Sequence, residues 1–166
     1  VVLIVLLIFH VPGLSSLRKL LNVLRTGPLL GIIAFGMTAV IISGEIDLSV
    51  GAGAALAGCI VAWVCGTLVD LVGGPFAAIT GIALAMAVGF ALGFSVGKFR
   101  QWFNVPSFIA TLALFTALRG VANLITGGFP LTTFPKGFDF LGGGYLFGIP
   151  FPVYIFALTF AGMHFL

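Results

Sequence analysis

Two long apolar runs with a short polar interruption between them constrain this chain more than any other feature. Leu29 to Ile42 carries no charged residue, and the second run extends from Val50 to Val72. Between them stands Ser43-Gly44-Glu45-Ile46-Asp47-Leu48-Ser49. A helix of about 20 apolar residues crosses a membrane, so the two runs predict neighbouring membrane helices. Charges beside such helices are costly and usually functional, which makes the interruption a candidate joint in a transport protein.

The composition indicates an integral membrane protein. Of the 166 residues, 61% are hydrophobic and 7% are charged, and the mean hydropathy is +1.31, whereas a soluble domain carries about 25% charged residues. The net charge of +3 comes from seven basic and four acidic residues. These are too sparse for a nucleic-acid surface, where basic residues cluster on one face. We therefore expect an all-α polytopic protein that contacts the lipid bilayer and binds no nucleic acid.

Sequence signatures of catalysis and metal binding are missing. No G-x-x-x-x-G-K-[ST] motif occurs, so we expect no nucleotide hydrolysis by a P-loop. Cys59 and Cys65 would lie about 240° apart around a helix, too far to form a disulfide or share a metal. His10 and His164 stand far from each other, with no second ligand at metal-binding spacing. The sequence predicts no catalytic residue, no cofactor and no metal site.

The lengths of the apolar segments, and the polar, glycine and proline residues between them, predict about six membrane helices, of which the first and last are truncated. The expected spans are Val1 to Phe9, a helix from near Pro28 to Ser43, Val50 to Val72, Pro75 to Gly97, Pro106 to Thr126, and a last one after Pro150. The second span is short. Either its helix reaches back towards Asn22, or the joint at Glu45 and Asp47 lies within the membrane thickness. The truncated ends favour a fragment of a larger polytopic protein.

Three connectors separate these spans. Residues 11–27 carry three basic residues and leucines at spacings of three and four, which predicts an amphipathic helix at the membrane interface. Residues 98–104 form a polar connector. Residues 127–150 are rich in glycine, proline and aromatics, and are either a docking surface for a partner or aromatic residues resting in the headgroup layer. Charge alone weakly favours a cytoplasmic location for residues 11–27 and 127–150.

Small residues recur at every fourth position of the fourth expected span. They are Ala77, Gly81, Ala85, Gly89, Gly93 and Gly97. Small side chains let membrane helices approach closely, so this stripe predicts close helix packing rather than a substrate path.

Four polar residues form a stripe on the fifth expected span. They are Thr116, Arg119, Asn123 and Thr126. Their spacing places them within an arc of about 80°. An arginine inside a membrane span is typical of a pathway lining. Alternatively, Arg119 extends its long side chain to the interface about 10 Å away, and both interpretations stay open.

The joint also has two interpretations. Asp47 or Ser49 can cap the following helix, and both Glu45 and Asp47 are favourable at its positive N-terminal end. Alternatively, these residues contact a transported solute, because broken helices in transporters place such ends at functional sites. The two roles are compatible if the joint is also a gate.

Several short motifs follow one another in a recognisable order. They are Gly36-Met37-Thr38, Ile46-Asp47-Leu48-Ser49-Val50-Gly51, Pro106-Ser107-Phe108-Ile109-Ala110-Thr111-Leu112, Leu118-Arg119-Gly120, Thr126-Gly127-Gly128 and Gly148-Ile149-Pro150. In this order they resemble the permease subunits of bacterial ABC importers for ribose, xylose and related monosaccharides, in the branched-chain amino acid/ribose permease superfamily. The resemblance covers nearly the whole chain. Glu45 stands where that family more often has glycine or another small residue.

The resemblance implies a bundle of about ten membrane helices in the bacterial inner (plasma) membrane. It also implies cytoplasmic ATPase subunits, an extracytoplasmic sugar-binding protein and a second permease subunit, identical or paralogous. The joint and residues 98–104 would face the cytoplasm, and residues 127–150 would be an extracytoplasmic loop, contrary to the charge distribution. The family's coupling loop would follow Leu166.

We therefore expect residues 1–166 to be one partial transmembrane permease domain, which forms a pathway for a monosaccharide and performs no chemistry itself. Two other functions stay open. One is an ion-coupled secondary transporter in which Glu45 and Asp47 bind a coupling ion or proton. The other is a membrane scaffold that transports nothing.

Overall fold

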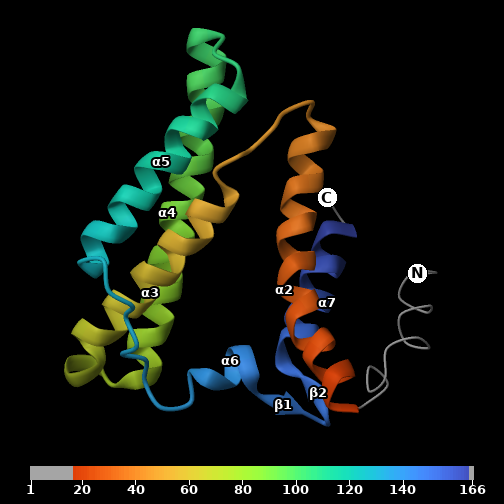
Figure 1. Cartoon of the computed structure of the whole chain (residues 1–166), viewed down its shortest axis with the longest axis vertical. Coiled ribbons are helices and arrows are strands. Elements are labelled where there is room, and N and C mark those ends of the chain that lie inside the picture. The colour runs from red at the N-terminus through yellow and green to blue at the C-terminus, as the bar shows by residue number, and fades with distance from the viewer. Residues whose placement is uncertain (1–16, 165–166) are drawn as a thin grey trace. The chain divides into compact units, whose positions relative to one another are not determined.

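The chain is helical throughout most of its described length (Figure 1). The computed structural model describes residues 17–164, with side chains from residue 21 onward. The elements are α2 (Leu17–Ile42), α3 (Val50–Val72), α4 (Gly74–Phe103), α5 (Ser107–Thr126), α6 (Asp139–Gly143), β1 (Tyr145–Leu146), β2 (Ile149–Pro150) and α7 (Phe151–His164). Among these residues, four helices are long and apolar enough to cross a membrane, namely α3, α4, α5 and the part of α2 from Leu21 to Ile42. The predicted all-α polytopic membrane fold is confirmed, while the expected span Val1 to Phe9 lies outside the described residues.

The chain divides into two compact units, which are described separately. One contains α2 as far as Gly36, together with α6, the β1–β2 hairpin and α7. The other is Met37–Phe138, with the end of α2 and the helices α3, α4 and α5. The second unit contains the joint and the residues that follow it.

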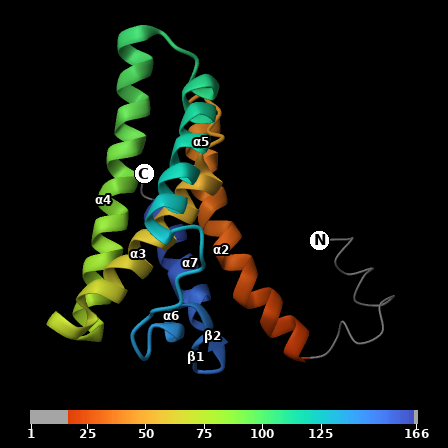
Figure 2. The same ribbon diagram turned by 60° about the vertical axis from the view of Figure 1, so that its left-hand side comes forward.

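Helix α3 is the centre of the second unit. It contacts both α4 and α5, and its ribbon crosses between them in Figure 2. Residues at intervals of four lie on one face of a helix, and the buried core includes four such residues of α3, followed by two of α5: Ala52, Leu56, Ile60, Val64, Leu118 and Ala122. The apolar face of α3 therefore holds α5 in place.

The stripe of small residues on α4 has two different surroundings. Ala77 is fully buried, and a Cβ added to Gly81 would lie 3.2 Å from the Cα atom of Val61 on α3. The predicted close packing is confirmed for this end of the stripe. A Cβ added to Gly89 or Gly93 would meet nothing within 4 Å, so the other end borders open space.

Two helices extend further than expected. Helix α2 is continuous from Leu17 and includes Pro28, so the helix reaches back beyond Asn22. Helix α4 continues through residues 98–103, where a connector was expected, because no glycine or proline interrupts it there. It ends at Asn104, which adopts the left-handed conformation (φ 51°) that asparagine tolerates.

Residues 127–150 contain more regular structure than the expected loop. Within the first unit, the Nε atom of Arg25 on α2 donates a hydrogen bond to the carbonyl of Gly142 in α6 (2.9 Å). The strands β1 and β2 pair as an antiparallel hairpin immediately before α7. Phe147, at the hairpin turn, is 93% exposed. The docking and headgroup interpretations of this segment both remain predictions.

Candidate functional site

The joint begins where α2 is terminated by a glycine. Gly44 has a φ of 75°, a conformation that glycine adopts without strain. Its N–H donates to the carbonyl of Ile41 (2.9 Å), and the N–H of Glu45 donates to the carbonyl of Val40 (3.1 Å). This is the Schellman arrangement, which satisfies carbonyls at a helix end. It also fixes the direction in which the chain leaves α2.

The residues that follow are non-helical, and α5 supplies partners for their backbone. The N–H of Ile46 donates to the hydroxyl of Ser107 (3.3 Å), and the N–H of Leu48 donates to the hydroxyl of Thr111 (3.2 Å). Both hydroxyl residues are buried, at 8% and 2% exposure. Backbone groups shielded from water need such partners. Two hydroxyls one helical turn apart on α5 therefore hold the non-helical segment.

Asp47 orders the start of α3. Its Oδ1 atom accepts hydrogen bonds from the backbone N–H (2.7 Å) and the hydroxyl (2.6 Å) of Ser49. Ser49 is the N-cap residue, and its side chain makes no capping bond to α3. The carboxylate thus binds the N-cap residue itself and lies at the helix end where negative charge is favourable.

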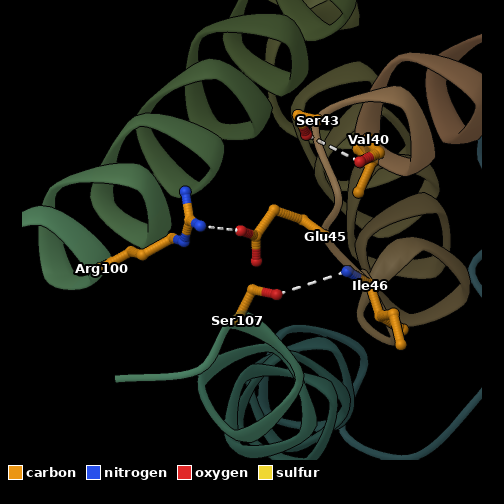
Figure 3. A network of polar contacts seen from close by, with 6 residues as sticks. All are labelled: Val40, Ser43, Glu45, Ile46, Arg100 and Ser107. Carbon is orange, nitrogen blue, oxygen red and sulfur yellow. Dashed lines mark hydrogen bonds and ion pairs between the residues drawn. The ribbon is translucent and has the colours of Figure 1, made fainter. Parts of the chain in front are cut away.

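Three elements meet at an ion pair beside the joint. The Glu45 carboxylate pairs with the guanidinium of Arg100, which comes from the last turn of α4 (Figure 3). Ser107, at the start of α5, lies next to the pair in the same view. The Glu45 side chain is 16% exposed and the Arg100 side chain is 55% exposed. An ion pair that water reaches in this way contributes only about 0–1 kcal/mol.

A cavity of about 520 Å³ lies within the second unit, and we call it the helix cavity. Its walls are mainly aliphatic side chains and glycines of α3, α4 and α5, including Val50, Gly53, Leu56, Val88, Gly89, Leu92, Gly93, Leu114 and Leu118. Its polar lining includes Glu45, Asp47, Ser49, Arg100, Ser107 and Thr111. A mostly apolar cavity with a few converging polar groups is typical of a small-molecule site.

A second cavity, of about 570 Å³, lies on residues of the joint, the end of α4 and the start of α5. We call it the joint cavity. It is lined by residues 44–46, 100–101 and 104–108. Both cavities therefore border the Glu45–Arg100 pair.

The predicted site residues fall into two separate places. Glu45, Asp47 and Ser49 line the helix cavity. The stripe of Thr116, Arg119, Asn123 and Thr126 lines neither cavity, since it lies on a different face of α5 from the residues buried against α3.

Within the stripe, the first three side chains are exposed and Thr126 is half-buried. The Arg119 guanidinium lies 5.5 Å from the centre of the Phe115 ring. The pathway role of this stripe stays a prediction.

Sequence reasoning did not identify several polar residues of this site, among them Arg100, Ser107 and Thr111. Arg100 appeared only as part of a connector, and Ser107 and Thr111 appeared only as members of a motif. The usable signal was the spacing of four between the two hydroxyl residues, immediately after a proline that precedes a helix. Among residues 17–164, no group of three or more His, Cys, Asp or Glu side chains is placed to hold a metal.

Replacing the buried hydroxyl of Thr111 should destabilise the second unit. Thr111→Val conserves the shape but leaves the N–H of Leu48 without its partner, which costs about 1–3 kcal/mol. We expect a lower midpoint of thermal unfolding for the purified protein in detergent. Thr111→Ser keeps the hydroxyl and should lie closer to the parent protein. Equal midpoints for Thr111→Val and the parent would contradict the role of this hydrogen bond.

Comparison with known proteins places the chain in a family. The sequence pattern of the family described as branched-chain amino acid transport system / permease component matches residues 19–165. No solved structure matches the chain.

Several curated relatives are similar over most of the chain. The ribose import permease protein RbsC of Bacillus subtilis (strain 168) is 43% identical over 151 residues, which are 90% of this chain and 45% of the relative. The probable ABC transporter permease protein YphD of Escherichia coli (strain K12) is 42% identical over 92% of this chain and 44% of its own length. The xylose transport system permease protein XylH of Haemophilus influenzae is 37% identical over 79% of this chain and 33% of its own length.

The chain spans a little under half the length of RbsC and YphD. The family match, which extends over nearly all of the chain, agrees with the four span-length apolar helices. The chain belongs to the family of branched-chain amino acid transport system permease components.

Proposed function

We propose that this chain is part of the transmembrane permease subunit of an ATP-dependent importer, and that it forms part of the translocation pathway for a monosaccharide. The observation that carries this proposal is the 43% identity, over 90% of the chain, to a ribose import permease. Similarity to a xylose transport system permease supports the same substrate class. The expected location is the bacterial inner (plasma) membrane.

The helix cavity suits a passage for a small polar solute. Its volume of about 520 Å³ lies within the range of about 300–1,000 Å³ that is usual for small-molecule sites. Carboxylate, guanidinium and hydroxyl groups in its lining can exchange hydrogen bonds with sugar hydroxyls. The remaining walls are mainly apolar and offer few such bonds. A solute that binds weakly can leave again, which a pathway requires.

Two groups of residues have different roles in this proposal. Glu45, Asp47 and Ser49 form the helix joint that acts as a gate, because they line the helix cavity at a break between two helices. The stripe of Thr116, Arg119, Asn123 and Thr126 faces away from that cavity. In a bundle of about ten helices, this stripe would face further helices and line a part of the pathway that lies outside the helix cavity.

The proposal assigns no chemistry to the chain itself. Cytoplasmic ATPase subunits would hydrolyse ATP, an extracytoplasmic sugar-binding protein would deliver the monosaccharide, and a second permease subunit, identical or paralogous, would complete the pathway. In this orientation the joint faces the cytoplasm and residues 127–150 face the outside.

Purification of the full-length gene product tests the proposal. The protein is expressed with the products of neighbouring genes, extracted from membranes, and assayed for bound ATPase subunits. We expect an ATPase to co-purify and its hydrolysis of ATP to be stimulated by a monosaccharide together with the binding protein. An intact membrane protein that captures no ATPase, and drives uptake from an ion gradient instead, would contradict the proposal.

Replacement of Arg119 tests the stripe on α5. Arg119→Ala removes a charged donor from the proposed pathway, and we expect monosaccharide uptake to fall by about tenfold, equivalent to about 1.4 kcal/mol in the barrier. The amount of protein in the membrane should not change. Lys98→Ala, at a basic residue that lines neither cavity, is the matched control. Unchanged uptake in Arg119→Ala would favour an arginine that only extends to the membrane interface.

A further inference from the structure

We propose that the ion pair between Glu45 and Arg100 is a gate between the helix cavity and the joint cavity, and that it opens for a polyhydroxyl solute. This inference rests on the proposed transport function. It goes beyond that function because it assigns the gate to a particular pair of charges, one of them on α4, and states what kind of solute can part them.

The ion pair stands where the two cavities meet. Five residues line both cavities: Glu45, Ile46, Arg100, Gln101 and Ser107. They therefore form the boundary between the two spaces. The two charged members extend from different elements, the joint and α4, and meet across this boundary (Figure 3). A solute that moves from one cavity to the other passes between their side chains.

One partner of the ion pair is held in place and the other can move. Glu45 follows the Schellman turn at the end of α2, and the next residue, Ile46, is bonded to Ser107. Its side chain is mostly buried. Arg100 is more than half exposed and stands in the last turn of α4. An exposed arginine has a long, flexible stem, so rotation of this side chain opens the boundary without moving a helix.

The chemistry of the pair selects the kind of solute that can separate it. When the pair separates, a carboxylate loses donors and a guanidinium loses acceptors. A carboxylate only accepts hydrogen bonds and a guanidinium only donates them. Each hydroxyl group of a sugar can do both, so a polyhydroxyl solute can replace both lost partners at once. An apolar solute can replace neither, and it leaves the gate closed.

The neighbouring acid, Asp47, belongs to the joint but does not stand on the boundary between the two cavities. Asp47 lines the helix cavity but is absent from the lining of the joint cavity. Its Oδ1 atom is bonded twice to Ser49. Among the acidic residues of the joint, Glu45 is the one on the boundary.

A thiol in the helix cavity reports whether the gate is closed. Gly53 lines the helix cavity and not the joint cavity, and a Cβ added there meets nothing within 4 Å. We would introduce Gly53→Cys into the full-length protein with Cys59→Ala and Cys65→Ala. Inside-out membrane vesicles would then be treated with a charged, membrane-impermeant methanethiosulfonate. The measured quantity is the rate at which the thiol is modified.

The ion pair predicts a definite pattern of rates. Glu45→Gln and Arg100→Gln should each raise the modification rate by about fivefold, which corresponds to loss of a partly exposed ion pair. The exchanged pair, Glu45→Arg with Arg100→Glu, should return the rate towards that of the parent. Lys98→Gln, two residues before Arg100 and on neither cavity, should leave the rate unchanged. Equal rates in the parent and both neutral variants would overturn the proposal, as would an exchanged pair as fast as the neutral variants.

A salt titration gives a second test that does not depend on the folding of the Glu45 variants. Raising the salt from about 0.01 to about 1 M shortens the Debye length from about 30 to about 3 Å. The rate in the parent should rise towards that of Arg100→Gln, whose own rate should change less. If the modification rates of the parent and of Arg100→Gln depended on salt in the same way, the proposed gate would be contradicted. Monosaccharide uptake is measured in parallel. If the parent protein takes up no monosaccharide, the proposed transport function is contradicted. The thiol modification rates still show, independently, whether the ion pair acts as a gate.

Discussion

A short non-helical stretch of backbone between two apolar helices needs hydrogen-bond partners, and the contacts that supply them determine how the second unit is arranged. Outside a helix, the N–H groups of Ile46 and Leu48 cannot find partners in their own segment. The hydroxyls of Ser107 and Thr111 accept from them, at the start of a helix that also buries Leu118 and Ala122 against α3. The same helix thus supports the joint at one end and builds the core along its length.

The positions of the functional groups follow from this arrangement. Because the non-helical segment is held against α5, Glu45 extends towards the end of α4 and meets Arg100. Helix α4 packs closely on α3 at Gly81 but has open space beside Gly93. The small-residue stripe of α4 therefore contacts α3 at one end and forms part of the wall of the helix cavity at the other. The helix cavity and the Glu45–Arg100 pair at its boundary both result from the contacts among α3, α4 and α5.

The fold class and the exact bounds of one helix could be predicted from the sequence, because both depend on local hydrophobicity. The apolar run Val50 to Val72 matches α3 residue for residue, since a glycine follows it and a polar segment precedes it. The extension of α4 to Phe103 was missed because Lys98 and Arg100 are also good helix formers. The polar residues at 98–104 suggested a connector, although helix propensity allows α4 to continue through residue 103.

The pairing of residues in the site could not be predicted, because it depends on contacts between distant parts of the chain. Glu45 and Arg100 are both charged, but nothing local indicates that α4 ends beside the joint. The orientation of α5 was equally hidden. Its stripe at Arg119 is polar, and a second face carries the polar residues Ser107 and Thr111, so polarity does not say which face turns inward. Packing of Leu118 against α3 decides this.

A steric block in the helix cavity tests whether a monosaccharide passes through it. Gly93→Phe would place a ring in the cavity, whereas Gly58→Phe adds the same ring to α3 at a position with open space that lines neither cavity. Uptake of a labelled monosaccharide is measured in the assembled full-length importer, with membrane content and ATPase binding checked for both variants. We expect Gly93→Phe to nearly abolish uptake and Gly58→Phe to retain it. Equal uptake by the two variants would contradict a pathway through this cavity.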